Sequence, residues 1–448
     1  MATTKPRSRS ARQSAYRPVQ AVEVRAWGKL VGAVALEPTK NYYAFIYDPS
    51  WVKRGIELAP LQMPLAQASE PFLFTDLPEE TYKRLPALLA DALPDDFGNA
   101  LIDAWMAERG LSKGMVSALD RLAYMGKRGM GALTFGPLRG PPPSKSTAIE
   151  MGKLVESARK AVQGDFDGDD HAITALKQII QVGTSAGGAR AKATIAWNPV
   201  TEEVRTGQFD IPDGFEAWLL KFDGMGVDHV LGPSKSYGRI EYAYYLMAQD
   251  AGIVMSPCRL LRENGRAHFM TKRFDRDGNE RLHMQTLCAM GHLDYKQIGT
   301  HSYNQLLQTA QALKLGRKAM AQLLRRMVFN VLAVNNDDHT KNFSFLLREG
   351  GQWELAPAYD ITHAHRADSQ WVRQHQMSVN GKFDRITLSD VRVVAERFGL
   401  LAELIPAVED VNRAVRRWVD FADEAQVDPK ERDGIALQMA ERDRIFDS

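Results

Sequence analysis

The eight residues NNDDHTKN at positions 335–342 follow an apolar run, Met327 to Val334, that has the pattern of a helix. Two strand-like runs come next, Phe343 to Leu347 and Trp353 to Leu355, with a Gly-Gly turn between them. A lone acidic residue, Asp360, follows the second run. The sequence therefore predicts a helix, a polar loop, a hairpin and one aspartate, in that order.

The polar loop has the residue types that phosphoryl transfer requires. That reaction needs a carboxylate near the attacking hydroxyl, with an Asn and a second Asp that hold a metal ion on the phosphates. Asp337 and Asn342 are five positions apart, the spacing of the protein-kinase catalytic loop, and Asp360 lies beyond the hairpin as the metal-binding Asp of kinases does. An ordinary polar turn is the alternative, because Asp, Asn and His are frequent turn residues. Further motifs upstream, in the order that a kinase requires, favour the catalytic interpretation.

Composition sets the broad class of the protein. The chain has 448 residues, of which 44% are hydrophobic and 25% charged, as in soluble globular proteins. No apolar run reaches the roughly 18 residues that span a bilayer, and the N-terminus has no apolar signal core. The 2 cysteines suit a reducing compartment, and a net charge of +2 does not indicate nucleic-acid binding by the whole chain. We therefore expect a cytoplasmic protein with no membrane contact.

The residue pattern of the first third of the chain predicts a basic arm and a small α+β domain. Residues 1–20 carry five basic residues and no acidic one, which favours a disordered arm, with phosphate contact as the alternative. Strand patterns occupy residues 22–47, and helical patterns follow over 79–124. A proline-rich run at 141–146 is typical of a linker, so we place the α+β domain at 21–140.

A glycine-rich segment, GTSAGGARAK at residues 183–192, precedes predicted strands at Lys192 to Trp197 and Glu216 to Phe222. Glycine lets backbone N–H groups surround phosphate oxygens, although an ordinary turn is the alternative. Lys221 lies at the end of an apolar strand and needs a phosphate or a Glu as partner, unless it reaches water. Glu241 opens the next helical pattern and is the expected partner; the alternative is a first-turn acid favoured by the helix dipole.

The second half of the chain is predicted to be mainly helical. A strand at Ala267 to Thr271 leads into a connector whose backbone we expect to be free to bind an adenine edge. Beyond it, residues 281–448 are helical in pattern apart from the hairpin at 343–355 and a short extended piece near 376–379. A basic helix face at 411–418 is expected to be solvated, with contact to DNA phosphates as the alternative.

These motifs together resemble the HipA family of bacterial serine/threonine kinases, the toxins of HipBA-type toxin–antitoxin pairs. The matching pieces are SAGGARAK at 185–192, Lys221, Glu241-Tyr242, RFDR at 273–276, NDDHTKN at 336–342 and Tyr359-Asp360. The N-terminal domain is also similar, in Leu85 to Trp105 and Tyr124 to Gly126. The resemblance covers nearly the whole chain after the basic arm, and its specificity lies in the order of the motifs.

The resemblance implies an α+β, two-lobed protein-kinase-like fold with an additional small N-terminal subdomain. Residues 149–275 would form the N-lobe with the glycine-rich loop. Residues 276–448 would form the mainly helical C-lobe with the catalytic loop.

The resemblance also implies the roles of individual residues. Asp337 would be the catalytic base, Asn342 and Asp360 would hold Mg²⁺, and Glu241 would form a structural ion pair with Lys221. The ATP site would consist of Gly187, Gly188, Ala189, Arg190, Ala191, Lys192, Lys221, Lys272, Arg273, Phe274, His339, Lys341, Asn342, Tyr359 and Asp360. Lys272 to Phe274 would lie at the adenine hinge.

The activity implied is an ATP- and Mg²⁺-dependent serine/threonine protein kinase that acts as a toxin. Autophosphorylation in the glycine-rich loop would switch it off, at Ser185 or at the adjacent Thr184. The implied partners are a protein substrate, of which an aminoacyl-tRNA synthetase is one kind in the family, and a HipB-like helix-turn-helix antitoxin. Operator DNA would be contacted mainly through the antitoxin complex.

Two other interpretations remain open. One is a phosphotransferase that acts on a small molecule, which would have a similar catalytic loop. The other is a catalytically silent co-repressor that binds the antitoxin, which the intact Lys221, Asp337, Asn342 and Asp360 disfavour. An experiment with labelled ATP distinguishes the three interpretations. Label would enter a protein, a small alcohol, or neither.

Overall fold

The structure, a computed structural model, describes residues 16–94, 96–141, 148–163, 191–223 and 236–447. Residues 183–190 of the glycine-rich segment, with Ser185 and Thr184, therefore lie outside the described residues. So does most of the predicted basic arm, residues 1–15, and most of the predicted linker.

Residues 16–20, which the sequence predicted to belong to the disordered arm, contact the N-terminal domain. The Tyr16 hydroxyl donates a hydrogen bond to Asp120 Oδ1 at 3.0 Å, and the Val19 N–H donates to the same oxygen at 2.9 Å. Val19 is buried in the core of the N-terminal domain. Apolar contact and a buried hydrogen-bond acceptor thus hold residues 16–20, which the basic composition of the segment did not indicate.

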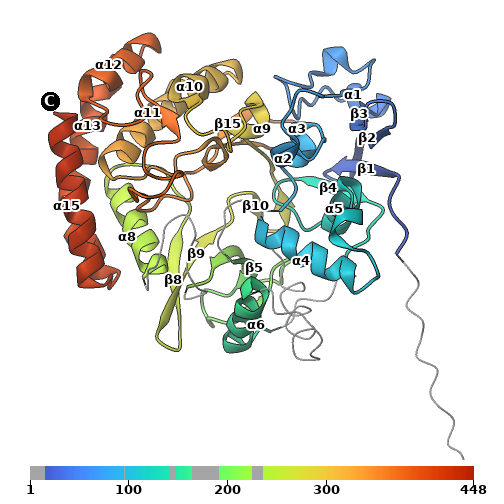
Figure 1. The fold of residues 1–448 in the computed structure, drawn as a ribbon, viewed down its shortest axis with the longest axis horizontal. Coiled ribbons are helices and arrows are strands. Elements are labelled where there is room, and N and C mark those ends of the chain that lie inside the picture. The colour runs from blue at the N-terminus through green and yellow to red at the C-terminus, as the bar shows by residue number, and fades with distance from the viewer. Residues whose placement is uncertain (1–15, 95, 142–147, 164–190, 224–235, 448) are drawn as a thin grey trace, which may run out of the picture.

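The N-terminal domain is an antiparallel sheet covered by short helices (Figure 1). The sheet order is β3-β2-β1-β4, and alternate residues of β1 are buried, as the sequence pattern predicted. Its elements are β1 Ala21–Ala26, β2 Lys29–Glu37, β3 Tyr42–Tyr47, α1 Pro49–Val52, η1 Leu65–Gln67, α2 Glu79–Tyr82, α3 Ala87–Ala90, α4 Asp96–Ala107, η2 Lys113–Met115, α5 Ala118–Met125 and β4 Leu133–Gly136.

The N-lobe is built on a five-stranded sheet of order β6-β5-β7-β9-β8. Its elements are α6 Met151–Gln163, β5 Lys192–Trp197, β6 Val204–Thr206, β7 Glu216–Lys221, α8 Tyr237–Asp250, β8 Cys258–Glu263, β9 Arg266–Lys272, β10 Arg276–Asp277 and β11 Glu280–Arg281. A Cβ atom on Gly238 would lie 2.1 Å from the Ala267 carbonyl oxygen, so only glycine lets α8 approach β9 this closely. This close approach places α8, and Glu241 on it, beside the sheet.

The C-lobe is mainly helical, as predicted, and forms the part of Figure 1 coloured yellow to red. Its elements are β12 His283–Thr286, α9 Leu287–Gly291, β13 His301–Ser302, α10 Tyr303–Ala312, α11 Arg317–Leu332, η3 Thr340–Asn342, β14 Ser344–Leu347, β15 Trp353–Leu355, β16 Met377–Ser378, α12 Leu388–Arg397, α13 Leu401–Arg416, α14 Trp418–Glu424 and α15 Pro429–Phe446. Strand β12 was not predicted. It pairs with β14 and turns the predicted hairpin into a three-stranded sheet.

Two large cores stabilise the described part of the chain. One joins the N-terminal domain to the N-lobe sheet, so that Val24 and Trp105 belong to the same cluster as Trp218 and Leu220. The other fills the C-lobe and includes the buried face of α8. The N-terminal domain is therefore packed onto the N-lobe as part of one folded body, and the predicted two-lobed α+β arrangement is confirmed.

The basic face predicted at residues 411–418 is neutralised by acidic neighbours. Its ion pairs are Arg413 with Asp410 at 2.7 Å, Arg416 with Asp443 at 3.3 Å and Arg417 with Asp250 at 2.9 Å. These exposed pairs agree with the predicted solvated face.

Candidate active site

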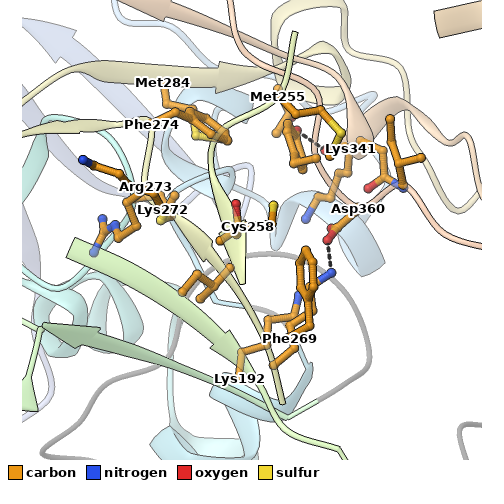
Figure 2. A pocket seen from close by; sticks show the side chains of 18 of the residues that line it. Lys192, Met255, Cys258, Phe269, Lys272, Arg273, Phe274, Met284, Lys341 and Asp360 are labelled. Carbon is orange, nitrogen blue, oxygen red and sulfur yellow. Dashed lines mark hydrogen bonds and ion pairs between the residues drawn. The ribbon is translucent and has the colours of Figure 1, made fainter. Parts of the chain in front are cut away.

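A pocket lies where the N-terminal domain and the two lobes meet, and most of the predicted site residues line it (Figure 2). Those that line it are Lys192, Lys221, Glu241, Lys272, Arg273, Phe274, Lys341, Asn342, Tyr359 and Asp360. In Figure 2, Lys272, Arg273, Phe274 and Met284 lie at one end, while Lys341 and Asp360 lie at the other. The pocket thus has an apolar end at the connector and a charged end at Asp360.

Lys221 is the centre of the charged end. It ends strand β7, and its ammonium group forms ion pairs with Glu241 of α8 and with Asp360. The Glu241 side chain is only 2% exposed, so a charge there requires a partner. Helix α8 begins at Tyr237, which places Glu241 in its second turn. The alternative of a first-turn acid held by the helix dipole is therefore wrong, and Glu241 contacts Lys221 as expected.

Asp360 is held in its ionised form. Burial acts to raise the pKa of its carboxyl, but the positive charges of Lys221 and Lys192 outweigh burial and hold that pKa well below its usual range. Its backbone has a φ of +52°, in the left-handed region that Asp tolerates better than most residues. Lys192 pairs with Lys221 across strands β5 and β7, so both cations serve the same end of the pocket.

The backbone of the connector is partly occupied. The Lys272 N–H donates to the Pro257 carbonyl at 2.8 Å, and the Arg273 N–H donates to the Ala217 carbonyl at 2.9 Å. The expectation of a free connector backbone is therefore wrong for these two N–H groups, because the sheet continues through them. Within the described part of the chain, the Phe274 N–H forms no hydrogen bond, so it remains as a donor at this end of the pocket.

The charged side chains of the connector are engaged with protein groups. Lys272 Nζ lies 2.6 Å from Glu216 Oε1. The Arg273 guanidinium donates two hydrogen bonds to Asp275, at 2.9 and 2.8 Å. Two positive charges beside Asp275 outweigh its burial and hold the pKa of its carboxyl well below the usual range. What the connector presents to a ligand is therefore its remaining backbone and the ring of Phe274.

The polar loop begins with a strained turn. Helix α11 ends at Leu332, and Val334, which is β-branched and buried, has a φ of +56°. Such a conformation persists only where the surrounding structure fixes it. Here the Asn335 N–H donates to the Asn330 carbonyl at 2.9 Å, and the Asn336 N–H donates to the Ala364 carbonyl at 3.0 Å. The loop is thus fixed to helix α11 on one side and to the backbone at Ala364 on the other.

Asp337 is enclosed but accessible, with 27% of its side chain exposed. Its Oδ1 accepts a hydrogen bond from Trp371 Nε1 at 2.6 Å and lies 3.7 Å from His339 Nε2. Burial raises the pKa of the Asp337 carboxyl; His339 and the Trp371 N–H oppose this effect, and the negative charge of Asp360 adds to it. A carboxyl with a raised pKa is suited to accept a proton.

Asn342 is oriented by the same loop. Its side-chain N–H₂ donates to the Asp337 backbone carbonyl at 2.7 Å, and its Oδ1 forms no hydrogen bond within the described residues. No three His, Cys, Asp or Glu side chains of the described ranges converge on a metal site. Mg²⁺ usually takes only one or two protein oxygens beside nucleotide phosphates. An amide oxygen from Asn342 and a carboxylate from Asp360, both on the pocket, fit that requirement.

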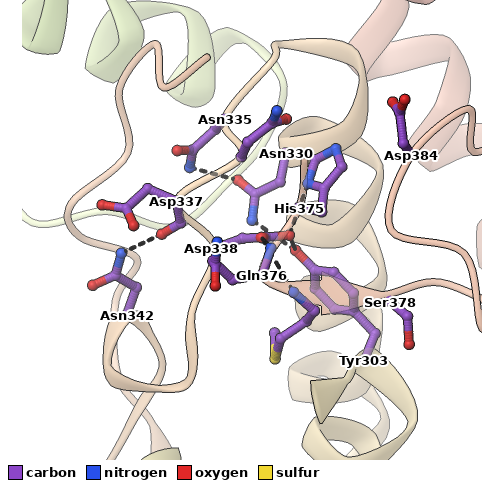
Figure 3. Close-up of polar contacts among 12 residues, drawn as sticks. Tyr303, Asn330, Asn335, Asp337, Asp338, Asn342, His375, Gln376, Ser378 and Asp384 are labelled. Atoms are coloured by element: carbon purple, nitrogen blue, oxygen red, sulfur yellow. Dashed lines mark hydrogen bonds and ion pairs between the residues drawn. The ribbon is translucent and has the colours of Figure 1, made fainter. Parts of the chain in front are cut away.

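Asp338 was missed as a structural residue. Its carboxylate is fully buried and accepts hydrogen bonds from the Tyr303 hydroxyl at 2.7 Å and the Gln376 N–H at 2.7 Å, with His375 Nδ1 at 3.0 Å. Figure 3 shows Asp338 directed toward these groups, with Asp337 and Asn342 on the other side of the loop. The network ties the polar loop to α10 and to the segment before β16.

The remaining predicted residues have varied outcomes. Tyr359 donates its hydroxyl to the Lys341 carbonyl at 2.6 Å and packs against Phe274, with ring centroids 5.4 Å apart. Ala191 is buried next to β5, and its carbonyl accepts from the Phe222 N–H at 3.0 Å. His339 caps η3 through Nδ1, at 3.2 Å from the Lys341 nitrogen, and does not line the pocket. Gly187, Gly188, Ala189, Arg190 and Ser185 lie outside the described residues.

Family comparisons cover almost the whole chain. Residues 22–136 match the model of the HipA N-terminal domain, and residues 184–441 match that of the HipA-like C-terminal domain. The serine/threonine-protein kinase toxin HipA of Shewanella oneidensis is 23% identical over 412 residues, covering 88% of this chain and 87% of that protein. The kinase-named protein Y4mE of Sinorhizobium fredii is 29% identical over 157 residues, but the match spans only 32% of this chain and 37% of that relative.

A solved structure has the same fold. It is the complex of HipA from Shewanella oneidensis MR-1 with HipB and operator DNA, matched with a TM-score of 0.67 at 18% identity. The match covers 95% of this chain and 97% of the solved chain. In the described part of this chain, no helix combines the length and the apolar character needed to cross a membrane.

Proposed function

Because this chain belongs to the HipA family, we propose that it is an ATP- and Mg²⁺-dependent protein kinase that phosphorylates serine or threonine. One observation carries the proposal. Lys221, Glu241 and Asp360 form an ion-paired cluster at one end of a pocket, and Asn342 of the pocket donates to the backbone carbonyl of Asp337, which lies just beyond the lining residues. These are the groups that phosphoryl transfer requires, from four separate segments of the chain.

The residues of the site divide the work of the reaction. Lys221 and Lys192 bind the phosphates, while the Phe274 N–H is placed to bind the base. Asn342 and Asp360 would hold Mg²⁺, which would neutralise phosphate charge. The substrate hydroxyl oxygen bonds to the γ-phosphorus, the bond from that phosphorus to the bridging oxygen of ADP breaks, and Asp337 accepts the hydroxyl proton. Trp371 donates to Oδ1 of Asp337, and no side chain of the described residues donates to Oδ2, so we assign acceptance of the proton to Oδ2. Positioning and charge stabilisation supply most of the acceleration.

Regulation and partners follow from the family. We propose that the enzyme phosphorylates itself at Ser185 or Thr184, which adds roughly two negative charges to the loop that binds ATP phosphates and switches the enzyme off. The Shewanella relative was solved with HipB and operator DNA. We propose that this chain likewise acts as a toxin, binds a HipB-like antitoxin and reaches operator DNA mainly through that partner.

The test is incubation with labelled ATP and Mg²⁺, followed by intact mass measurement and peptide mapping. Three proteins are compared: the parent, Asp337→Ala and Asp368→Ala. Asp368 is an exposed aspartate that pairs with Arg366 at 2.7 Å, outside the pocket, and serves as the matched control. Phosphate on Ser185 or Thr184 in the parent and in Asp368→Ala, but not in Asp337→Ala, is the expected result.

The other outcomes have distinct meanings. Transfer that survives in Asp337→Ala removes the base from this mechanism. ATP binding without transfer to protein contradicts the protein-kinase proposal and leaves a small-molecule phosphotransferase or a silent co-repressor.

A further inference from the structure

The N-terminal domain reaches into the pocket between the two lobes. Leu88 of α3, Asp91 and Ala92 just after it, and Leu133 of β4 all line the pocket. Leu88, Ala92 and Leu133 are apolar and form part of the pocket wall. Asp91 is the one carboxylate that this domain contributes among the described lining residues.

Asp91 has unused capacity as a hydrogen-bond acceptor. Its Oδ2 accepts from the Thr286 N–H at 2.7 Å, and its Oδ1 accepts from the Thr286 hydroxyl at 2.8 Å. An ionised carboxylate has about four acceptor positions, so each oxygen retains one. Burial raises the pKa of the Asp91 carboxyl, and the positive charge of Lys341 opposes that effect.

The contacts of Asp91 place it between the two ends of the pocket. Its partner Thr286 lies two residues after Met284, which stands beside Phe274 at the connector end in Figure 2. Thr286 also pairs with Ser344, two residues beyond Asn342 of the charged end. In a nucleotide, the ribose joins the base to the phosphates. A ligand whose base lies at the connector and whose phosphates lie at Lys221 therefore has its ribose at the level of Asp91.

We infer that Asp91 of the N-terminal domain binds a ribose hydroxyl of the nucleotide, so that this domain helps to select a ribonucleotide. The inference rests on the proposed function, since it takes the pocket to be the ATP site. A carboxylate that accepts hydrogen bonds from ribose hydroxyls is a common device of nucleotide recognition. Loss of one such bond to a charged acceptor weakens binding by about tenfold or more.

A purely structural role does not account for this placement. Helix α2, which precedes α3, is held on the C-lobe by other contacts, since the Thr81 hydroxyl donates to Asp294 at 2.5 Å and the Tyr82 hydroxyl donates to the Cys288 carbonyl at 3.1 Å. The Thr286 hydroxyl already caps α9, at 3.3 Å from the Ala289 nitrogen. The N-terminal domain is therefore attached to the C-lobe by contacts of its own, and these contacts lie outside the pocket.

The experiment measures dissociation constants by calorimetry for Mg²⁺ complexes of ATP, 2′-deoxy-ATP and 3′-deoxy-ATP. The proteins are the parent, Asp91→Asn and Asp294→Asn. Asparagine preserves the size of Asp91, and the Thr286 hydroxyl can either donate to it or accept from it. Asp294→Asn is the matched control, because it alters an aspartate–threonine contact between the same two domains away from the pocket.

We expect the parent and Asp294→Asn to bind at least one deoxynucleotide about tenfold more weakly than ATP. Asp91→Asn should lose this preference and bind ATP about as weakly as the deoxynucleotide. A parent that binds all three nucleotides equally, an Asp91→Asn protein that keeps the preference, or the same loss in Asp294→Asn would overturn the inference. A parent that binds no ATP would instead contradict the proposed function itself.

Discussion

Asp337 and Asp338 are neighbours in sequence with the same side chain, yet they lie on opposite faces of one loop (Figure 3). Asp338 faces the C-lobe core, is fully buried and accepts hydrogen bonds from two segments, around Tyr303 and Gln376. Asp337 faces outward with 27% of its side chain exposed and one side-chain donor, Trp371. The two carboxylates therefore have opposite environments.

The comparison teaches how a loop can be rigid and reactive at once. A buried carboxylate surrounded by donors stabilises one conformation, because every alternative leaves polar groups unpaired. A carboxylate with few donors in a closed site keeps affinity for a proton, because burial disfavours its charge. The strained Val334 at the start of the loop is held in place by the backbone hydrogen bonds of Asn335 and Asn336. The position of the Asp337 carboxylate depends on this turn.

The largest expected effect is on stability, from Asp338→Ala. This change leaves the Tyr303 hydroxyl and the Gln376 N–H without an acceptor in the core. The free energy of unfolding should fall by about 3–5 kcal/mol, with loss of activity following from loss of the loop. Chemical unfolding, monitored by tryptophan fluorescence, measures this change in the free energy of unfolding. Tyr303→Phe removes one of the donors to Asp338 and also the acceptor of the Asn330 amide, and should cost less, about 1–3 kcal/mol. Equal, small losses in both variants would mean that Asp338 is not the anchor.

The next effect is on activity alone, from Asp337→Asn. The amide cannot accept the proton of the attacking hydroxyl, so kcat should fall roughly 10²–10⁴-fold. The free energy of unfolding should not fall, because the carboxyl with a raised pKa is replaced by a neutral group of the same size. Phosphoryl transfer and unfolding are measured on the same preparation. A variant that loses activity and stability together would erase the distinction between the two aspartates.

A smaller effect is expected from Trp371→Phe. The ring remains, but Asp337 Oδ1 loses its side-chain donor, so kcat should fall roughly tenfold. The KM for ATP should be unchanged, because Trp371 does not line the pocket. Trp353→Phe is the control, since the Trp353 N–H donates to the Glu57 carbonyl at 3.2 Å, away from Asp337. A change in KM for ATP, or the same loss of kcat in the control, would count against a positioning role for Trp371.

Local patterns explain what the sequence could predict. Strand β5 has the predicted bounds, Lys192–Trp197, because its apolar run is continuous. The order from α11 to Asp360 follows from residue patterns that lie close together in the sequence. Lys221 and Glu241 could be matched because a buried lysine requires an acid and the next helix offers one.

Distant contacts explain what the sequence could not predict. Asp91 and Thr286 are 195 residues apart, and Asp337 and Trp371 are 34 apart, so no periodicity brings them together. Strand β12 has four residues, with buried polar side chains at His283 and Gln285 in place of an alternating pattern. The roles of Asp337 and Asp338 differ only through the direction in which each side chain points, which depends on the turn at Val334.

The smallest expected effect is a pH dependence of stability that distinguishes Asp337 from Asp338. The folded protein holds a proton on Asp337 more tightly than the unfolded chain does, because burial raises the pKa of this carboxyl. Its protonated form therefore favours folding below the unfolded pKa, near 3.9, and this contribution is lost as pH rises through the raised folded pKa. Asp337→Asn should thus be more stable than the parent at neutral pH, and the difference should shrink as the pH falls toward 4. Unfolding curves of both proteins at matched pH values measure it. A parent that is the more stable protein at neutral pH would show that Asp337, like Asp338, is held mainly for the fold.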